Sequence, residues 1–84
     1  MSYALEFKAA AEKELRKLPH AVMPRIVDAV RALGETPRPH GCLKLSGSQS
    51  WRIRIGDYRV IYDIDDQRQP VVVLHIGHRR AAYR

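Results

Sequence analysis

The most regular pattern of apolar and polar positions lies in residues 51–62, where two alternating runs flank the pair Gly56-Asp57. Alternation with a period of two is typical of a β-strand, and Gly-Asp between two such runs is typical of a two-residue hairpin turn. Pairing outward from this turn places Arg54 directly opposite Arg59. One face of the hairpin is then apolar and is predicted to face the core: Trp51, Ile53, Ile55, Tyr58, Val60 and Tyr62.

Further elements are predicted on both sides of this hairpin. Residues 3–8 alternate and predict a short first strand. Residues 9–18 and 22–33 space their apolar side chains three and four positions apart, which predicts two helices, with Gly34 as the C-terminal cap of the second. Residues 71–76 form a nearly continuous apolar run, which favours a strand in the interior of the sheet.

Together these elements predict one domain of class α+β that spans residues 1–84. We expect a small antiparallel sheet of about four strands with an N-terminal helical hairpin packed on one face, in the order β-α-α-β-β-β. If Ile64 pairs near Pro70, Arg59 has His75 as its neighbour on the face away from the core.

Composition narrows the possible partners. Fifteen Lys and Arg against nine Asp and Glu give a net charge of +6 and a pI near 10.0, which indicates a polyanionic partner such as a nucleic acid. The single Cys42 excludes an internal disulfide. No apolar run reaches the roughly 18 residues of a membrane span, so we expect a cytoplasmic protein with no membrane contact.

The polar face of the hairpin carries Arg52, Arg54 and Arg59. Like charges opposite each other in a sheet are destabilising, and three guanidinium groups on adjacent strands suit a phosphodiester, which they can grip with two hydrogen bonds each. Arginines on the solvated side of a half-buried sheet are also common. The hairpin alone therefore leaves a solvated face and a phosphate site as nearly equal interpretations.

The sequence gives weaker evidence for a nucleophilic cysteine, a zinc site or an aromatic residue that stacks on a base. Cys42 and His40 lie in a Pro/Gly-rich loop with no third group to orient them, which favours a structural or incidental role over a nucleophile and base. His75 and His78 have no clear third and fourth ligand for zinc. Trp51 could stack on a base, but its position in the alternation favours the core.

Several segments carry a resemblance to a known family. They are KLSG at residues 44–47, WRIRIGDYRVIYDIDD at 51–66 and IGHRRAAY at 76–83, with ELRKLP at 14–19 and TPR at 36–38. In this succession the chain resembles the RelE family of bacterial toxins, within the wider RelE/ParE group, over almost its whole length. The hairpin and IGHRR segments together are fairly specific, although each alone would be weak.

The resemblance implies a fold and an activity. It implies a sheet with two helices and a ribosome-dependent endoribonuclease that cuts messenger RNA by attack of a ribose 2′-hydroxyl, leaving a 2′,3′-cyclic phosphate and a 5′-hydroxyl. It also implies neutralisation by a cognate antitoxin that is acidic and partly disordered until bound, with contact to operator DNA only through that antitoxin. No metal or other cofactor is required.

The same resemblance assigns site residues. Carried over by position, the catalytic set is Arg52, Arg54, Arg59, Arg79 and Tyr83, and we add Lys44, His75, His78 and Arg80 as RNA-binding candidates. Well-studied members of the family have lysines where this chain has Arg52 and Arg54, and an arginine is a poor general base. The base is therefore open between Tyr83, which the family suggests, and the local histidines His75 and His78, whose type suits proton transfer near neutrality.

Two other functions remain possible on the sequence. One is a ParE-like toxin that inhibits DNA gyrase by binding, without cutting nucleic acid. The other is a catalytically inactive relative that uses the arginines only to bind phosphates of RNA or DNA. The set of basic residues followed by a terminal tyrosine favours the nuclease.

Overall fold

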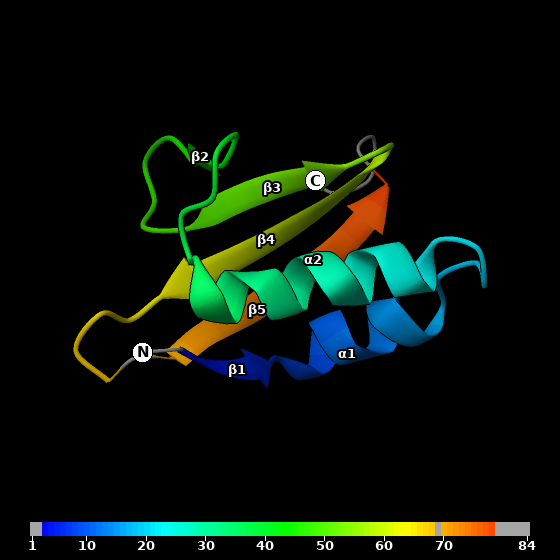
Figure 1. Cartoon of the computed structure of the whole chain (residues 1–84), viewed down its shortest axis with the longest axis horizontal. Coiled ribbons are helices and arrows are strands. Elements are labelled where there is room, and N and C mark those ends of the chain that lie inside the picture. Colours follow the sequence, from blue (N-terminus) through cyan, green and yellow to red (C-terminus); the bar gives the residue numbers. More distant parts are fainter. Residues whose placement is uncertain (1–2, 69, 79–84) are drawn as a thin grey trace.

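A computed structural model describes residues 3–68 and 70–78, and in them a five-stranded sheet is combined with two helices (Figure 1). The elements follow the order β1 (Ala4–Phe7), α1 (Ala9–Arg16), α2 (Met23–Glu35), β2 (Leu43–Lys44), β3 (Trp51–Ile55), β4 (Tyr58–Ile64) and β5 (Pro70–His78). Across the sheet the strands lie in the order β1-β5-β4-β3-β2. The predicted α+β class is confirmed.

The sheet differs from the prediction in two respects. It contains the additional strand β2, which has only two residues and so shows no alternation that the sequence could reveal. It is also mixed, because β1 runs parallel to β5 while the other pairs are antiparallel. The chain between β1 and β5 contains both helices and the other three strands, and a parallel pair needs a long connection of this kind in place of a hairpin turn.

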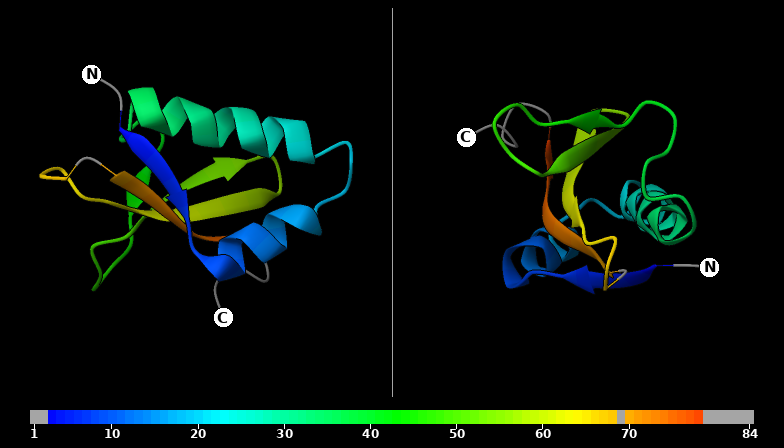
Figure 2. Two further views of the ribbon diagram at one scale, coloured as in Figure 1. Left: turned by 90° about the horizontal axis from the view of Figure 1, so that it is seen from below. Right: turned by 90° about the vertical axis from the view of Figure 1, so that its left-hand side faces the viewer.

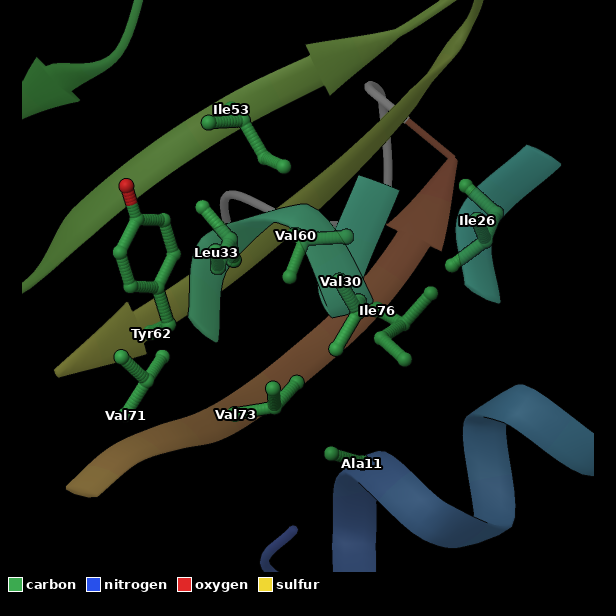
Figure 3. Packing of buried hydrophobic residues seen from close by; sticks show 10 residues of the cluster. All are labelled: Ala11, Ile26, Val30, Leu33, Ile53, Val60, Tyr62, Val71, Val73 and Ile76. Carbon is green, nitrogen blue, oxygen red and sulfur yellow. The ribbon is translucent and has the colours of Figure 1, made fainter. Parts of the chain in front are cut away.

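The two helices take different places against the sheet. Figures 1 and 2 show α2 lying across one face, whereas α1 lies beside β5, beyond the end of β1. Neither helix is long and apolar enough to cross a membrane, as far as the described residues show. The main core lies between the helices and the sheet (Figure 3) and comprises Ala11, Ile26, Val30, Leu33, Ile53, Val60, Tyr62, Val71, Val73 and Ile76.

The hairpin of β3 and β4 has the predicted register. Arg54 pairs with Arg59, and Ile55 pairs with Tyr58 next to the turn. Gly56 has a φ of 60°, a backbone conformation that glycine adopts without the steric cost of a side chain, and this turn fixes every pair that follows it. The predicted apolar face is confirmed, because its side chains lie in the core cluster or pack against it.

The predicted register between β4 and β5 was wrong. Ile64 pairs with Val71 and not with Pro70, and the ladder shifts between Ile61 and Tyr62 so that β5 holds one extra residue. This irregularity brings Val73 and Ile76 to the same core face, although strict alternation would place them on opposite faces. As a result Arg59 pairs with Gly77, and His75 pairs with Ile61.

Gly34 does not cap α2 as predicted, because it lies within the last helical turn and Thr36 follows as the cap. Because Gly34 has no side chain, the N-terminal segment can pack closely against α2 at this position. The Tyr3 amide donates a hydrogen bond of 2.6 Å to the Gly34 carbonyl, and a Cβ at Gly34 would lie 3.1 Å from the Tyr3 carbonyl oxygen. The glycine therefore lets the start of β1 pack onto α2.

Gly34→Ala is expected to lower the free energy of unfolding by about 1 kcal/mol. Overpacking against a fixed backbone atom costs about 1–3 kcal/mol, and alanine recovers about 1 kcal/mol of helix propensity. Urea unfolding measures the change. Ala32→Gly, at an exposed position of the same helix, measures the difference in helix propensity between alanine and glycine alone. A Gly34→Ala protein more stable than the wild type would contradict the packing role of Gly34.

Side chains from three distant segments meet at the end of the sheet where β4 turns into β5. Asp66 accepts hydrogen bonds from the Tyr3 hydroxyl at 2.9 Å and from both terminal nitrogens of Arg38, at 2.9 and 3.3 Å. The Arg38 guanidinium also lies over the Trp51 ring, 5.2 Å from its centroid, and Tyr62 donates to the Pro37 carbonyl at 2.8 Å. These contacts hold the loop after α2 against the sheet.

The Asp66 cluster predicts a loss of stability in acid. The hydrogen bonds from Arg38 and then Tyr3 hold the pKa of Asp66 below its ordinary value. A lowered folded-state pKa contributes stability that is present above the unfolded-state value and is lost as pH falls through the folded-state value. We therefore expect Asp66→Asn to be less stable than the wild type in urea at pH 7, with the gap narrowing as the pH falls below the ordinary pKa of an aspartate carboxyl. A gap that stays the same in acid would contradict this.

Candidate nucleic-acid interface

Three arginines lie on the face of the sheet opposite α2, and we call this surface the arginine face: Arg52 and Arg54 on β3, and Arg59 on β4. The alternation of the hairpin sends these side chains away from Ile53 and Val60, which are in the core. The predicted grouping of the three arginines on one face is therefore correct. Their exposure differs, since Arg54 is exposed, Arg52 is half-buried and Arg59 is buried.

Arg59 occupies the middle of the arginine face. Only 8% of its surface is exposed, and among the described residues Arg59 is the one charged residue classed as buried. Its ladder neighbours are Arg54 on β3 and Gly77 on β5. Gly77 has no side chain, so at this pair β5 places no side chain of its own next to the guanidinium. A buried guanidinium is weakly screened by solvent, which strengthens its attraction to a phosphate.

His75 also lies on this face of the sheet. It pairs with Ile61, two residues from Arg59 along β4, so the predicted direct pairing of His75 with Arg59 is replaced by a diagonal one. Diagonal neighbours in a sheet are still within reach of long side chains. The His75 side chain is 56% exposed, and its Nδ1 lies 3.5 Å from Oε1 of Glu14 on α1.

Two predicted RNA-binding residues lie elsewhere. Lys44 pairs with Trp51, which packs against the core, and so it projects toward the α2 side of the sheet. His78 pairs with Tyr58, and the two rings meet edge to face with their centroids 5.5 Å apart. Both therefore have the opposite orientation to the arginine face. The remaining predictions, Arg79, Arg80 and Tyr83, lie outside the described residues.

Two residues near the arginine face were missed by sequence reasoning. Leu43 pairs with Arg52 and is 52% exposed, which makes it an apolar side chain on the same side of the sheet. Glu14 reaches β5 from α1 across 62 positions of sequence. The two-residue strand β2 shows no alternation, and no local pattern marks a contact as distant as that of Glu14.

The opposite end of the same strands is acidic. The lining of a hollow there includes four carboxylates and one arginine, namely Glu6, Asp63, Asp65, Asp66 and Arg68. Carboxylates repel a phosphate backbone, whereas the arginine face attracts it. The charge distribution therefore favours binding of a polyanion at the end of the sheet near the hairpin turn.

The arginine face can bind a phosphodiester and stabilise additional negative charge on it. Guanidinium groups donate paired hydrogen bonds to phosphate oxygens, and groups fixed on strands need little reorganisation when charge develops. Residues 3–68 and 70–78 contain no cluster of three or more His, Cys, Asp or Glu side chains that could hold a metal ion. The chemistry that these residues can supply is phosphate binding together with proton transfer by an imidazole.

Comparisons with known proteins identify relatives of this chain. A family model described as the ParE toxin of type II toxin-antitoxin system, parDE, matches residues 5–83. Toxin RelG of Mycobacterium tuberculosis is 34% identical over 86 aligned residues, which cover 100% of this chain and 99% of the relative. The mRNA interferase toxin RelE of Escherichia coli is 32% identical over 82 residues, covering 94% of this chain and 85% of the relative.

A solved structure shows the same fold. The chain matches a structure of the archaeal RelE–RelB complex from Pyrococcus horikoshii with a TM-score of 0.83 and 29% sequence identity, over 96% of this chain and 99% of the matched one. The match of the family model over nearly the whole length, together with these relatives, establishes the family. This chain belongs to the RelE family of toxins, within the RelE/ParE group of type II toxin-antitoxin systems.

Proposed function

We propose that this chain is a toxin that cleaves messenger RNA on the ribosome without a metal ion. The observation that carries the proposal is the pairing of Arg54 with Arg59 beside Arg52, on the face opposite α2. Opposed like charges weaken a sheet, so this arrangement is better explained by an anionic ligand than by folding. The Escherichia coli relative, named an mRNA interferase, supports RNA as that ligand.

The reaction that fits these residues is attack of a ribose 2′-hydroxyl on the adjacent phosphate. Arg52, Arg54 and Arg59 bind the phosphate and stabilise the charge that develops on its oxygens, together with Arg79 by family resemblance. The products are a 2′,3′-cyclic phosphate and a 5′-hydroxyl. Because no water molecule is added in this step, the protein must only orient the sugar, hold the phosphate and move a proton.

A cognate antitoxin is the proposed second partner. The Pyrococcus horikoshii RelE in the matched structure is in complex with RelB, and a domain of net charge +6 is suited to an acidic segment that folds as it binds. Such a segment would compete with RNA for the arginine face. We expect contact with operator DNA to occur only through the antitoxin.

Ribosomes programmed with a defined mRNA test the proposal directly. Primer extension after addition of the purified protein is expected to show new 5′ ends within the ribosome-bound codon region, and no such ends on the same mRNA without ribosomes. Absence of new ends with active ribosomes would reject the nuclease function. An equimolar antitoxin, once identified, should abolish the signal.

The family description as a ParE toxin favours one alternative, inhibition of DNA gyrase by binding. A supercoiling assay with purified gyrase separates the two functions. The nuclease proposal expects unchanged supercoiling at protein concentrations that give complete mRNA cleavage. Inhibited supercoiling with intact mRNA would favour the alternative.

A further inference from the structure

The edge of β5 is completed by a side chain. β1 pairs with β5 only from Pro70 to Val73, and the Lys8 amide donates the last hydrogen bond of this ladder to the Val73 carbonyl at 2.9 Å. The chain then turns into α1. Beyond this point the Ile76 amide donates to Oε1 of Glu14 at 3.0 Å, so a helix carboxylate replaces the missing strand partner.

The same carboxylate oxygen faces an imidazole. Oε1 of Glu14 lies 3.5 Å from Nδ1 of His75, and both side chains are partly exposed, 40% and 56% respectively. A carboxylate next to Nδ1 favours the tautomer that carries its proton there. Nε2 then has a free lone pair and can accept a proton.

This imidazole lies beside the arginine face. His75 pairs with Ile61, and Arg59 is two residues further along β4 on the same side of the sheet. A phosphate bound by Arg59 would therefore have a histidine within reach of its sugar. His78, by contrast, pairs with Tyr58 on the α2 side, and an arginine stays protonated and cannot accept the proton.

We propose that His75 is the general base for the 2′-hydroxyl and that Glu14 is its positioning residue; this inference rests on the proposed function. Nε2 of His75 takes the proton of the 2′-hydroxyl while the 2′-oxygen forms its bond to phosphorus. The bond from phosphorus to the 5′-oxygen breaks, and its electron pair leaves with that oxygen. The 5′-oxygen takes a proton from water, and the imidazolium returns its proton to solvent, so atoms and charge balance.

Nitrogen NMR of the imidazole tests the geometry without any cleavage assay. Long-range proton–nitrogen spectra of the full chain, with ¹⁵N-labelled histidine, are expected to show neutral His75 as the Nδ1–H tautomer. Glu14→Gln should weaken this preference, whereas Glu12→Gln, on the same helix and paired with Arg16, should leave it unchanged. A neutral His75 protonated at Nε2 in the wild type overturns the proposed pair.

Single-turnover cleavage on programmed ribosomes tests the chemical role. His75→Gln is expected to lower the maximal rate by about 100-fold or more, the usual range for a general base, with little change in the protein concentration that gives half the maximal rate. Glu14→Gln can still accept the hydrogen bond from the Ile76 amide and should lower the same rate by about 10- to 100-fold, the usual effect of losing a group that orients a histidine. His20→Gln, in the loop between the helices, is the matched control.

The outcomes separate the two proposals. If the wild type cleaves mRNA and the His75→Gln and Glu14→Gln variants cleave it at the same rate, the nuclease function is supported and the proposed roles of His75 and Glu14 are rejected. Loss of ribosome binding with a normal maximal rate also rejects it, because it would make His75 a binding residue. No cleavage by the wild type would remove the proposed function and the base together, even where NMR shows the Nδ1–H tautomer.

Discussion

Arg59→Ala is expected to reduce mRNA cleavage on the ribosome by about 100- to 1000-fold while the protein stays folded. This is the usual effect of removing one donor that stabilises charge in a transition state. Arg59 is 8% exposed and pairs with Arg54 on β3 and Gly77 on β5, so its guanidinium is held in the middle of the arginine face by the surrounding packing. Single-turnover cleavage measures the loss, and circular dichroism and thermal unfolding check the fold.

Two further variants sharpen the Arg59 result. Arg59→Lys keeps the charge but loses the planar pair of donors, and we expect it to recover only part of the rate. Arg16→Ala removes an equal charge from the exposed surface of α1 and should cleave at the wild-type rate. Full activity of Arg59→Ala would show that Arg59 has no role in cleavage. An equal loss of rate in Arg16→Ala would show that only the net charge of the protein matters.

Tyr62→Ala is expected to cause the largest loss of stability, about 3–5 kcal/mol, which is the usual cost of removing a large buried ring. Tyr62 has no exposed surface and lies in the core cluster. Natural domains have a free energy of unfolding of about 5–15 kcal/mol and small ones lie toward the lower end, so this loss should remove most of the stability. Urea unfolding followed by tryptophan fluorescence measures the change.

Tyr62→Phe isolates the hydroxyl. The phenol donates a hydrogen bond to the Pro37 carbonyl at 2.8 Å, and burial raises its pKa. We expect Tyr62→Phe to lose only about 1 kcal/mol, the net value of one such bond. A loss equal to that of Tyr62→Ala would mean that the hydrogen bond to the loop after α2, and not the packing of the ring, provides the stability.

The parts of the fold that local chemistry fixes could be predicted from the sequence. The Gly56-Asp57 turn sets the register of β3 and β4, and strict alternation then assigns each side chain to a face. The same logic fails for β5, because residues 71–76 are apolar throughout and show no alternation that would reveal an extra residue. The parallel direction of β1 depends on its pairing with β5, the last strand of the chain, and no local pattern reveals a contact that distant.

The candidate site also has a part that the sequence predicts and a part that it does not. The grouping of Arg52, Arg54 and Arg59 follows from the hairpin and was predicted. The position of His75 relative to Arg59 depends on the irregular ladder and was predicted with the wrong register. The contact of Glu14 with β5 depends on where β1 ends and α1 begins. Long-range contacts of this kind require the assembled structure.

The most direct test of the central claim replaces one ribose in the substrate. An mRNA with a single 2′-deoxy nucleotide on the 5′ side of the mapped cut is placed in the ribosome and incubated with the wild-type protein. The 2′-hydroxyl mechanism predicts that cleavage at this position stops while an otherwise identical all-ribose mRNA is cut to a 2′,3′-cyclic phosphate and a 5′-hydroxyl. Continued cleavage of the deoxy substrate at the same bond would contradict the account.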